Sequence, residues 1–182
     1  MTDKSAYHHG DLRQALIDEA LKSLEEAGLE SLSLRRLAEE TGVSKNAPYR
    51  HFVTKTELLR TLAAEGYQQF ADKLQQAEQE LLHLPIPERV QAIYRVYGSF
   101  ALDHPELYRL MFSRLGNSLH SERCKQNAER AFGVLQNVCS DMVKKGEDPR
   151  KVILSLYASL HGWVMLLLDD LIPPEIGVDQ SN

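Results

Sequence analysis

The stretch SLSLRRLAEETGVSKNAPYRHFVTKTELL, residues 31–59, decides the fold of this 182-residue chain. Its first half places apolar side chains at the i, i+3 and i+4 positions of a helix: Leu34, Leu37 and Ala38. Gly42 follows, and the i, i+3 spacing begins again with Tyr49 and Phe52. This order of helix, tight turn and helix is typical of a helix-turn-helix DNA reader, whose second helix enters the major groove.

The residues of the turn support this interpretation. Gly42 stands where a helix often ends in a left-handed residue, a conformation that glycine adopts without steric cost. Val43 can anchor the turn in an apolar core, and Ser44 is a preferred N-cap for the helix that follows. Any corner between two helices in a helical protein would fit Gly-Val-Ser equally well, so the next residues carry the distinction.

The segment after the turn is short, polar and rich in hydrogen-bond donors, and we predict a helix over residues 45–51. Lys45 and Asn46 would project from its N-terminus, where a recognition helix meets base edges, and Ala47 is small enough to contact a thymine methyl. Donors suited to phosphate oxygens follow: Tyr49, His51 and Lys55. A solvated helix face would also carry Lys and Arg, but would rarely combine them with Tyr and His.

The same stretch resembles the DNA-binding signature of the TetR family of bacterial transcriptional regulators over roughly residues 10–60. The preceding YHHGDLRQALIDEALKSLEEAGLESLSLRRLA, residues 7–38, resembles the first helix of that family and the lead into its second. APYRHF (47–52), YHHGDLR (7–13) and LHGW (160–163) together resemble one subgroup, whose C-terminal domain is named for a Trp-His-Gly-type motif.

The resemblance implies a role for each matching residue. Arg35 matches a position that reaches a base edge, and Lys55 matches a phosphate-clamping lysine. The variable base-reading positions are Lys45, Asn46 and Ala47, and the positions that contact the DNA backbone are Ser44, Tyr49 and His51. Pro48 departs from the commoner leucine. Because proline lacks an N–H, it removes an intrahelical donor and can tighten or bend that turn.

Composition sets the class of the protein. Hydrophobic residues make up 43% and charged residues 26%, as is usual for a soluble globular protein. We find no apolar run long enough to cross a bilayer and no apolar signal-peptide core, and therefore expect a cytoplasmic protein with no membrane partner.

Cys124 and Cys139 lie about four turns of 5.4 Å apart in one predicted helix, too far for a disulfide within it. Buried thiols are the favoured interpretation, ahead of a redox sensor or ligand contacts.

The net charge of −5 is unusual for a DNA-binding protein. Residues 1–60 carry a net charge of −1 and residues 61–182 a net charge of −4, so neither part has the positive net charge that would explain binding to DNA. The acids fall outside the segment from Ser44 to Lys55, which is locally basic. A local basic face can still release counterions from DNA, and we expect a moderate salt dependence with few phosphates contacted per subunit.

The chain is predicted to be all-α. A helix-turn-helix DNA-binding domain of three helices spans residues 1–53, and a helical effector-binding and dimerisation domain spans residues 54–182. A long helix capped by Thr54 and Glu57 joins them. The predicted helices cover residues 11–27, 34–41, 45–51, 54–82, a segment from 87 to the break at 103–105, a segment around 107–112, 121–145 and 149–171, with a loop at 116–118.

The last two long helices are more apolar than the surface of a monomer requires. A fully internal core helix is one explanation and a two-fold dimer interface is another. The family resemblance implies the second, a four-helix interface between two copies. The residues predicted for it are Leu135, Met142, Val152, Leu156, Leu160, Val164 and Leu167.

Aromatic residues between Tyr94 and Phe132 suit either a small-molecule pocket or a plain core. The resemblance favours an effector cavity, for which the candidate residues are Tyr97, Phe100, Tyr108, Met111, Phe112, Cys124 and His161. His104, His120 and His161 lack metal-ligand spacing, so we predict no metal and no cofactor.

Two functions from different classes remain open. The first is a homodimeric repressor that a small, apolar or aromatic effector releases from a double-stranded DNA operator. The second is a helical small-molecule carrier or enzyme that uses the C-terminal cavity. We predict no enzymatic activity, because the sequence shows no convergent catalytic set and no Gly-rich phosphate loop.

Overall fold

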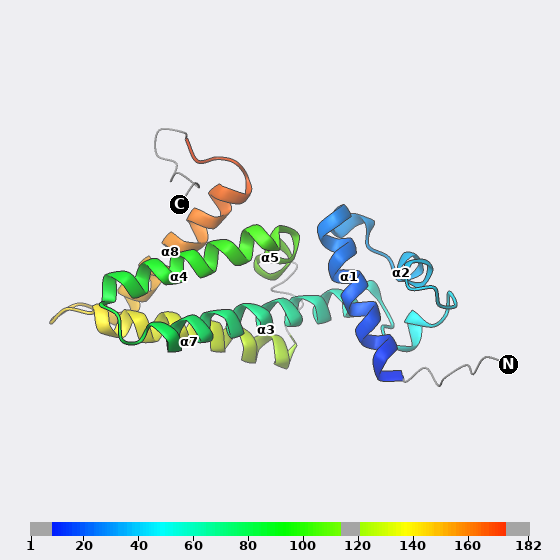
Figure 1. Cartoon of the computed structure of the whole chain (residues 1–182), viewed down its shortest axis with the longest axis horizontal. Helices are drawn as coiled ribbons and strands as arrows, with labels where there is room; N and C mark the ends of the chain where they lie inside the picture. The colour runs from blue at the N-terminus through cyan, green and yellow to red at the C-terminus, as the bar shows by residue number, and fades with distance from the viewer. Residues whose placement is uncertain (1–8, 114–120, 174–182) are drawn as a thin grey trace. The chain divides into compact units, whose positions relative to one another are not determined.

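The computed structural model of the chain describes residues 9–113 and 121–173, and in these ranges it contains helices and turns but no strand. The elements are α1 (His9–Ser31), α2 (Leu34–Glu40), the 3₁₀-helix η1 (Pro48–Arg50), α3 (Lys55–Leu81), α4 (Ile86–Asp103), α5 (Pro105–Phe112), α7 (Glu122–Met142) and α8 (Pro149–Leu168) (Figure 1). The predicted all-α class is confirmed. The predicted loop at 116–118 and His120 lie outside the described residues.

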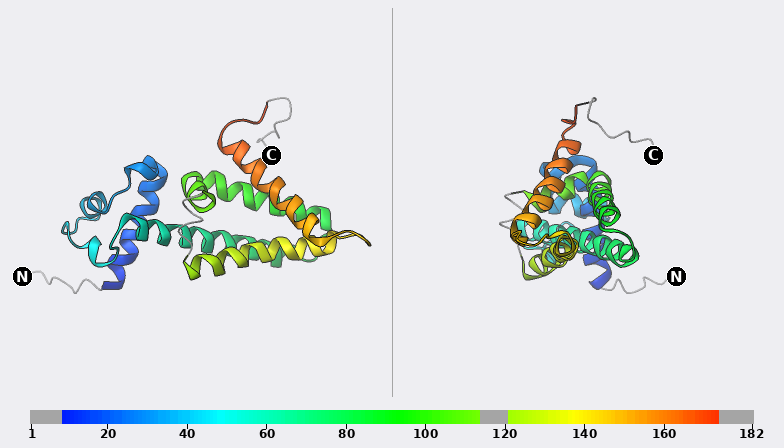
Figure 2. Two further views of the ribbon diagram at one scale, coloured as in Figure 1. Left: turned by 180° about the vertical axis from the view of Figure 1, so that it is seen from behind. Right: turned by 90° about the vertical axis from the view of Figure 1, so that its left-hand side faces the viewer.

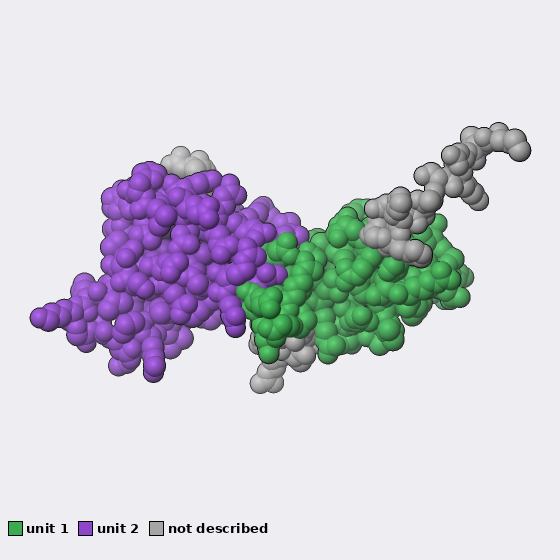
Figure 3. Space-filling model, turned by 90° about the horizontal axis from the view of Figure 1, so that it is seen from below, with its two compact units in different colours: residues 1–68, 106–126 green, residues 69–105, 127–182 purple. Residues whose placement is uncertain are grey.

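The chain forms two compact units, which differ from the predicted division at residue 53 (Figure 3). The first unit comprises residues 1–68 and 106–126, and the second comprises residues 69–105 and 127–182. The first unit extends past residue 53 because α5 packs with both α1 and α3: Glu25 of α1 accepts hydrogen bonds from the first turn of α5, and Tyr67 of α3 donates to the carbonyl of Met111. The assignment of functions to residues 1–53 and 54–182 stays a prediction.

The core of the first unit is built from the apolar faces of its helices. The buried side chains include Leu16, Ile17, Ala20 and Leu24 of α1, Leu34, Leu37 and Ala38 of α2, Leu58, Leu59 and Leu62 of α3, and Leu107, Tyr108 and Met111 of α5. Gly28 has φ 74° and ψ 171°, which interrupts α1 where the sequence predicted its end. The spacing of apolar residues therefore places α1, α2 and α3 correctly.

In the second unit, α4 packs against α8, and the later part of α3 runs beside α7 (Figure 2). Phe70 of α3 lies between two aromatic rings of α4, with ring centroids 4.8 Å from Tyr97 and 4.9 Å from Phe100. Arg130 of α7 donates hydrogen bonds to Asp72 and Gln75 of α3. Apolar burial and these polar contacts together hold the four helical segments as one unit.

Helix α8 is strongly apolar, as the sequence predicts for the last two long helices. Among the described residues, Pro149–Leu168 is long and apolar enough to cross a bilayer by length and composition, with a mean hydropathy of 1.6. The prediction that no such segment exists is therefore wrong. Only 17% of the apolar window is buried in the single chain, so α8 is not a fully internal helix either. A single helix of this kind is weak support for a membrane span, and exposed apolar surfaces also mark sites of interaction with other proteins.

Candidate nucleic-acid interface

The turn after α2 has the geometry that the sequence predicted. Gly42 adopts φ 68°, in the left-handed region. Its N–H donates to the carbonyl of Glu39 at 3.3 Å, and the N–H of Val43 donates to the carbonyl of Ala38 at 3.0 Å. These two bonds form a Schellman motif, which satisfies carbonyls that the end of a helix leaves unpaired. The turn therefore ends α2 sharply and redirects the chain.

The next element is shorter than predicted. Instead of a helix over residues 45–51, residues 45–47 form a turn, and η1 covers only Pro48–Arg50. Proline has no N–H to donate to the carbonyl of Ser44, and that carbonyl accepts from Ala47 at 2.9 Å instead. The N–H of His51 donates to the carbonyl of Pro48 at 2.9 Å, which continues the i→i−3 spacing of a 3₁₀-helix. Ala47 is the N-cap of η1 and no side chain caps it, so the prediction of Ser44 as the helix N-cap is wrong, whereas its contact with the DNA backbone stays a prediction.

The start of α3 follows the prediction more closely. The N–H of Glu57 donates to the hydroxyl of Thr54 at 3.1 Å, as in a capping box. The carboxylate of Glu57 accepts from the N–H of Val53, one residue before the position that a standard capping box uses. Lys55 is half-buried, and its ammonium donates to the carbonyl of Leu29 at 2.7 Å. Because an ammonium has three donors, two of them remain for a phosphate.

Residues 44–50, which we call the reading segment, present mostly exposed side chains. Ser44, Lys45, Asn46 and Arg50 are exposed, and 51% of the Tyr49 surface is accessible. Ala47 is half-buried, and the Pro48 ring is buried beneath the segment. The core therefore anchors the backbone of this segment, while its polar side chains face outward.

His51 is half-buried, and its predicted contact with phosphate stays a prediction. Its Nε2 is buried and has no hydrogen-bond partner among the described residues. The next residue, Phe52, is fully buried, and the guanidinium of Arg13 lies over its ring at 5.3 Å. His51 is thus drawn inward with the end of η1, and its ring places only part of its surface within reach of a ligand.

The charges around the reading segment favour an anionic partner. The segment from Ser44 to Lys55 contains no acid. The nearest acids on α2 are paired within their own helix: Arg35 lies 3.4 Å from Glu39, and Arg36 lies 2.6 Å from Glu40. Arg35 still exposes 70% of its side chain. A basic surface of this kind can attract DNA even though the whole chain is acidic.

Known families match both parts of the chain. Residues 16–62 match the family of bacterial regulatory proteins of the tetR type, and residues 90–181 match the tetracyclin repressor-like C-terminal domain. The chain belongs to the TetR family. The subgroup named for a Trp-His-Gly-type motif stays a prediction.

The relatives of this TetR-family chain cover it to different extents. The tetracycline repressor protein class C of Escherichia coli is 49% identical over 51 residues, which are 28% of this chain and 23% of that protein. An HTH-type transcriptional regulator of Mycobacterium bovis is 24% identical over 134 residues, 72% of this chain and 57% of that protein. The chain thus spans less than two thirds of the length of both. A solved structure from Rhodococcus sp. RHA1 is 30% identical, with a TM-score of 0.79 and coverage of 93% and 89%.

The residues predicted for the dimer interface of this TetR-family chain differ in how deeply they are buried. Four of them fill the core of the second unit and expose at most 7% of their surface: Leu135, Leu156, Leu160 and Val164. These four are buried within the single chain and offer little surface to a second copy, and the dimer interface stays a prediction. Met142, Val152 and Leu167 are half-buried. The large apolar side chains exposed on α7 and α8 are instead Phe132, Leu154 and Leu166.

The residues predicted to bind an effector pack within their own units. In the second unit, Tyr97 and Phe100 are buried beside Phe70, and the half-buried His161 stacks on the ring of Tyr157. Burial lowers the pKa of His161. In the first unit, the predicted residues on α5 and α7 are the buried Tyr108, Met111 and Cys124 and the half-buried Phe112. A role for any of them toward an effector stays a prediction.

The cysteines and histidines provide no metal site in residues 9–113 and 121–173, where no group of three or more His, Cys, Asp or Glu is arranged to hold an ion. Cys124 and Cys139 are both free and buried, and burial raises the pKa of both thiols. A raised pKa keeps a thiol protonated and unreactive. This confirms the interpretation of the two cysteines as buried thiols.

Proposed function

We propose that this chain is a homodimeric, sequence-specific DNA-binding repressor that a small molecule releases from its operator. The reading segment is the observation that carries the proposal. It is exposed, free of acids, and anchored by a Schellman turn on one side and by the capped start of α3 on the other. In a chain of the TetR family, these features support an operator as the partner.

In this proposal, the reading segment enters the major groove from the N-terminal end of η1. Lys45 and Asn46 are exposed and contact base edges, and the half-buried Ala47 allows close approach. Tyr49 and Lys55 donate to phosphate oxygens on either side. Arg35 supplies a further base contact from α2. Because these residues lie on a turn and a short 3₁₀-helix, their base contacts will differ from those of relatives that have a longer helix there.

We propose that two copies pair through the exposed apolar side of α7 and α8. Phe132 exposes 38%, Leu154 65% and Leu166 45% of the residue surface in the single chain. The rings of Phe132 and Tyr157 meet edge to face with centroids 6.1 Å apart, so apolar side chains of α7 and α8 adjoin at this point. A dimer would cover this face and place two reading segments on half-sites about 34 Å apart along the DNA.

The proposed regulation is a shift between two states of the dimer. An effector that binds the DNA-incompetent state more tightly than the competent state weakens operator binding by the ratio of the two affinities. We place this regulator in the cytoplasm and assign it no enzymatic activity. The relatives named as transcriptional regulators support both assignments.

A gel-shift assay tests the proposal. DNA from the region upstream of the protein's own gene is offered at two salt concentrations with random-sequence competitor, and random-sequence selection follows if that DNA fails. The proposal expects a complex that resists competitor and weakens as salt rises. Failure of both DNA sources to give a competitor-resistant complex would refute it.

A further inference from the structure

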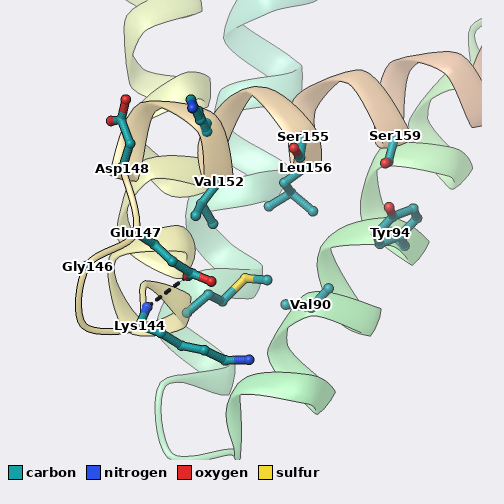
Figure 4. Close-up of a pocket in the computed structure, with 12 residues that line it drawn as sticks. Val90, Tyr94, Lys144, Gly146, Glu147, Asp148, Val152, Ser155, Leu156 and Ser159 are labelled. Atoms are coloured by element: carbon teal, nitrogen blue, oxygen red, sulfur yellow. Dashed lines mark hydrogen bonds between the residues drawn. The ribbon is translucent and has the colours of Figure 1, made fainter.

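The charges that select a ligand are balanced in one part of the chain and one-sided in another. The second unit contains a cleft of about 800 Å³ between α4, the end of α7 and the first half of α8 (Figure 4). Its lining carries Lys144 and Lys151 but also Glu147 and Asp148, so its charges balance. The reading segment, by contrast, contains two basic residues and no acid, and therefore favours an anionic or acceptor-rich partner.

Arg50 is the basic residue of the reading segment for which the sequence predicts no role. It is exposed at the last position of η1. Other arginines of the first unit have partners: Arg35 and Arg36 pair with carboxylates of their own helix, and Arg13 lies over an aromatic ring. Within residues 9–113 and 121–173, the guanidinium of Arg50 has no partner of either kind, so its five N–H donors remain for a ligand.

The 3₁₀ geometry of the segment sets the side of η1 on which Arg50 lies. The N–H of Arg50 donates to the carbonyl of Ala47 at 3.2 Å, and Ala47 itself has helical backbone angles, φ −62° and ψ −44°. Side chains three residues apart eclipse each other in a 3₁₀-helix, whereas in an α-helix they diverge by about 60° around the axis. Arg50 therefore lies in line with Ala47, which is a predicted base-reading position.

The burial of the neighbouring residues agrees with this arrangement. Pro48 and His51 are also three residues apart and both turn inward, since the proline ring and Nε2 of the histidine are buried. Tyr49 is exposed and belongs to neither pair. The segment thus has one side toward the core, one side with Ala47 and Arg50, and one side with Tyr49, which the proposed function assigns to a phosphate.

We propose that Arg50 reads a guanine in each half-site of the operator. Its planar guanidinium fork matches the N7 and O6 acceptors that guanine presents in the major groove. A phosphate would accept the same donors, but Arg50 shares its side of the segment with Ala47 and not with Tyr49. The inference rests on the proposed function, because it requires the reading segment to lie in the major groove.

The test measures the binding of the full chain to operator variants by fluorescence anisotropy. The operator is the sequence obtained by random-sequence selection, and each base pair of one half-site is changed in turn. For the unmodified chain, changing one particular G·C pair should weaken binding about 5- to 150-fold, the discrimination that one bidentate pair provides. Arg50→Ala should show no preference at that pair and should keep the preferences at the other positions.

Arg150→Ala is the matched control, because Arg150 is exposed and lies on α8, outside the reading segment. It should keep every base preference of the unmodified chain. Circular dichroism should be unchanged in both variants, since both side chains are exposed. The inference is overturned if Arg50→Ala keeps all the base preferences, whether its affinity is unchanged or is weakened equally for every sequence, as the loss of a phosphate contact would do.

Failure of the proposed function gives a different result. If the unmodified chain forms no competitor-resistant complex with any selected DNA, the proposed function and this inference both fail. If the unmodified chain binds one sequence specifically and Arg50→Ala has the same base preferences, only the assignment of Arg50 fails and the proposed function stands.

Discussion

Replacing Glu25 should loosen α5 from α1 within the first unit. The two carboxylate oxygens of Glu25 each accept one backbone hydrogen bond, from Glu106 and from Leu107, and both are 3.0 Å long. These N–H groups belong to the first turn of α5, where a helix has no internal acceptor for them. The negative charge also lies at the positive end of the helix dipole. A residue 81 positions away along the chain thus acts as the cap of this helix.

The magnitude follows from these two bonds. A hydrogen bond to a charged group contributes about 1.5–3 kcal/mol, but Glu25 is half-buried, so water can reach the freed donors. Loss of an N-cap side chain costs about 0.5–2 kcal/mol. We therefore expect Glu25→Ala to lower the free energy of unfolding by about 2 kcal/mol. Glu25→Gln keeps one acceptor and should cost about 1 kcal/mol.

Urea unfolding and amide hydrogen exchange measure the two consequences. In the Glu25→Ala variant, the amides of Glu106 and Leu107 should exchange faster than in the unmodified chain. Glu26→Ala is the control, because its side chain is exposed on the same helix turn and caps nothing among the described residues. The reasoning fails if both variants unfold at the same urea concentration and the two amides keep their protection.

Other changes test separate parts of the structure. A Cβ at Gly98 would lie 2.5 Å from the ring of Trp163. Gly98→Ala should therefore lower the free energy of unfolding in urea by about 1–3 kcal/mol and change the tryptophan fluorescence. Gly162→Ala is the control and should do neither, because a Cβ there meets open space. Burial lowers the pKa of His161 below its usual 6.5, so the unfolded chain binds a proton at a higher pH than the folded chain. The free energy of unfolding should therefore fall as the pH drops below about 6.5. Urea melts of His161→Gln should show a smaller fall. Leu154→Asp should yield a folded monomer by sedimentation and circular dichroism, because it places a charge on the proposed dimer face; a dimer of unchanged affinity would exclude that face.

The sequence predicts both ends of the reading segment well, because residues close in the sequence decide the structure there. Gly42 and the apolar residues around it specify the Schellman turn, and Thr54 with Glu57 specifies the start of α3. The prediction of a helix over residues 45–51 was wrong, because Pro48 has no N–H to donate and the helical spacing of its neighbours does not compensate for that loss. The cap that Glu25 provides could not be predicted, since it joins segments far apart in the sequence.

The candidate surfaces of the second unit were harder to predict for a related reason. Helix α8 carries apolar residues almost all round, so its sequence does not distinguish the side that packs on α4 from the side that faces outward. The structure makes the distinction, with Leu160 and Val164 inside and Leu154 and Leu166 outside.

The central claim is that the reading segment contacts the operator, and the double variant Lys45→Ala, Tyr49→Ala tests it most directly. Fluorescence anisotropy compares its affinity for the selected operator and for random DNA with those of the unmodified chain. Lys145→Ala is the control, since it removes the same charge outside the reading segment. We expect the double variant to lose at least about 30-fold in operator affinity, because each of the two lost contacts costs about 1–3 kcal/mol and every 1.4 kcal/mol is tenfold. Its fold should remain unchanged, because both side chains are exposed. Operator affinity that matches the Lys145→Ala control would contradict the claim.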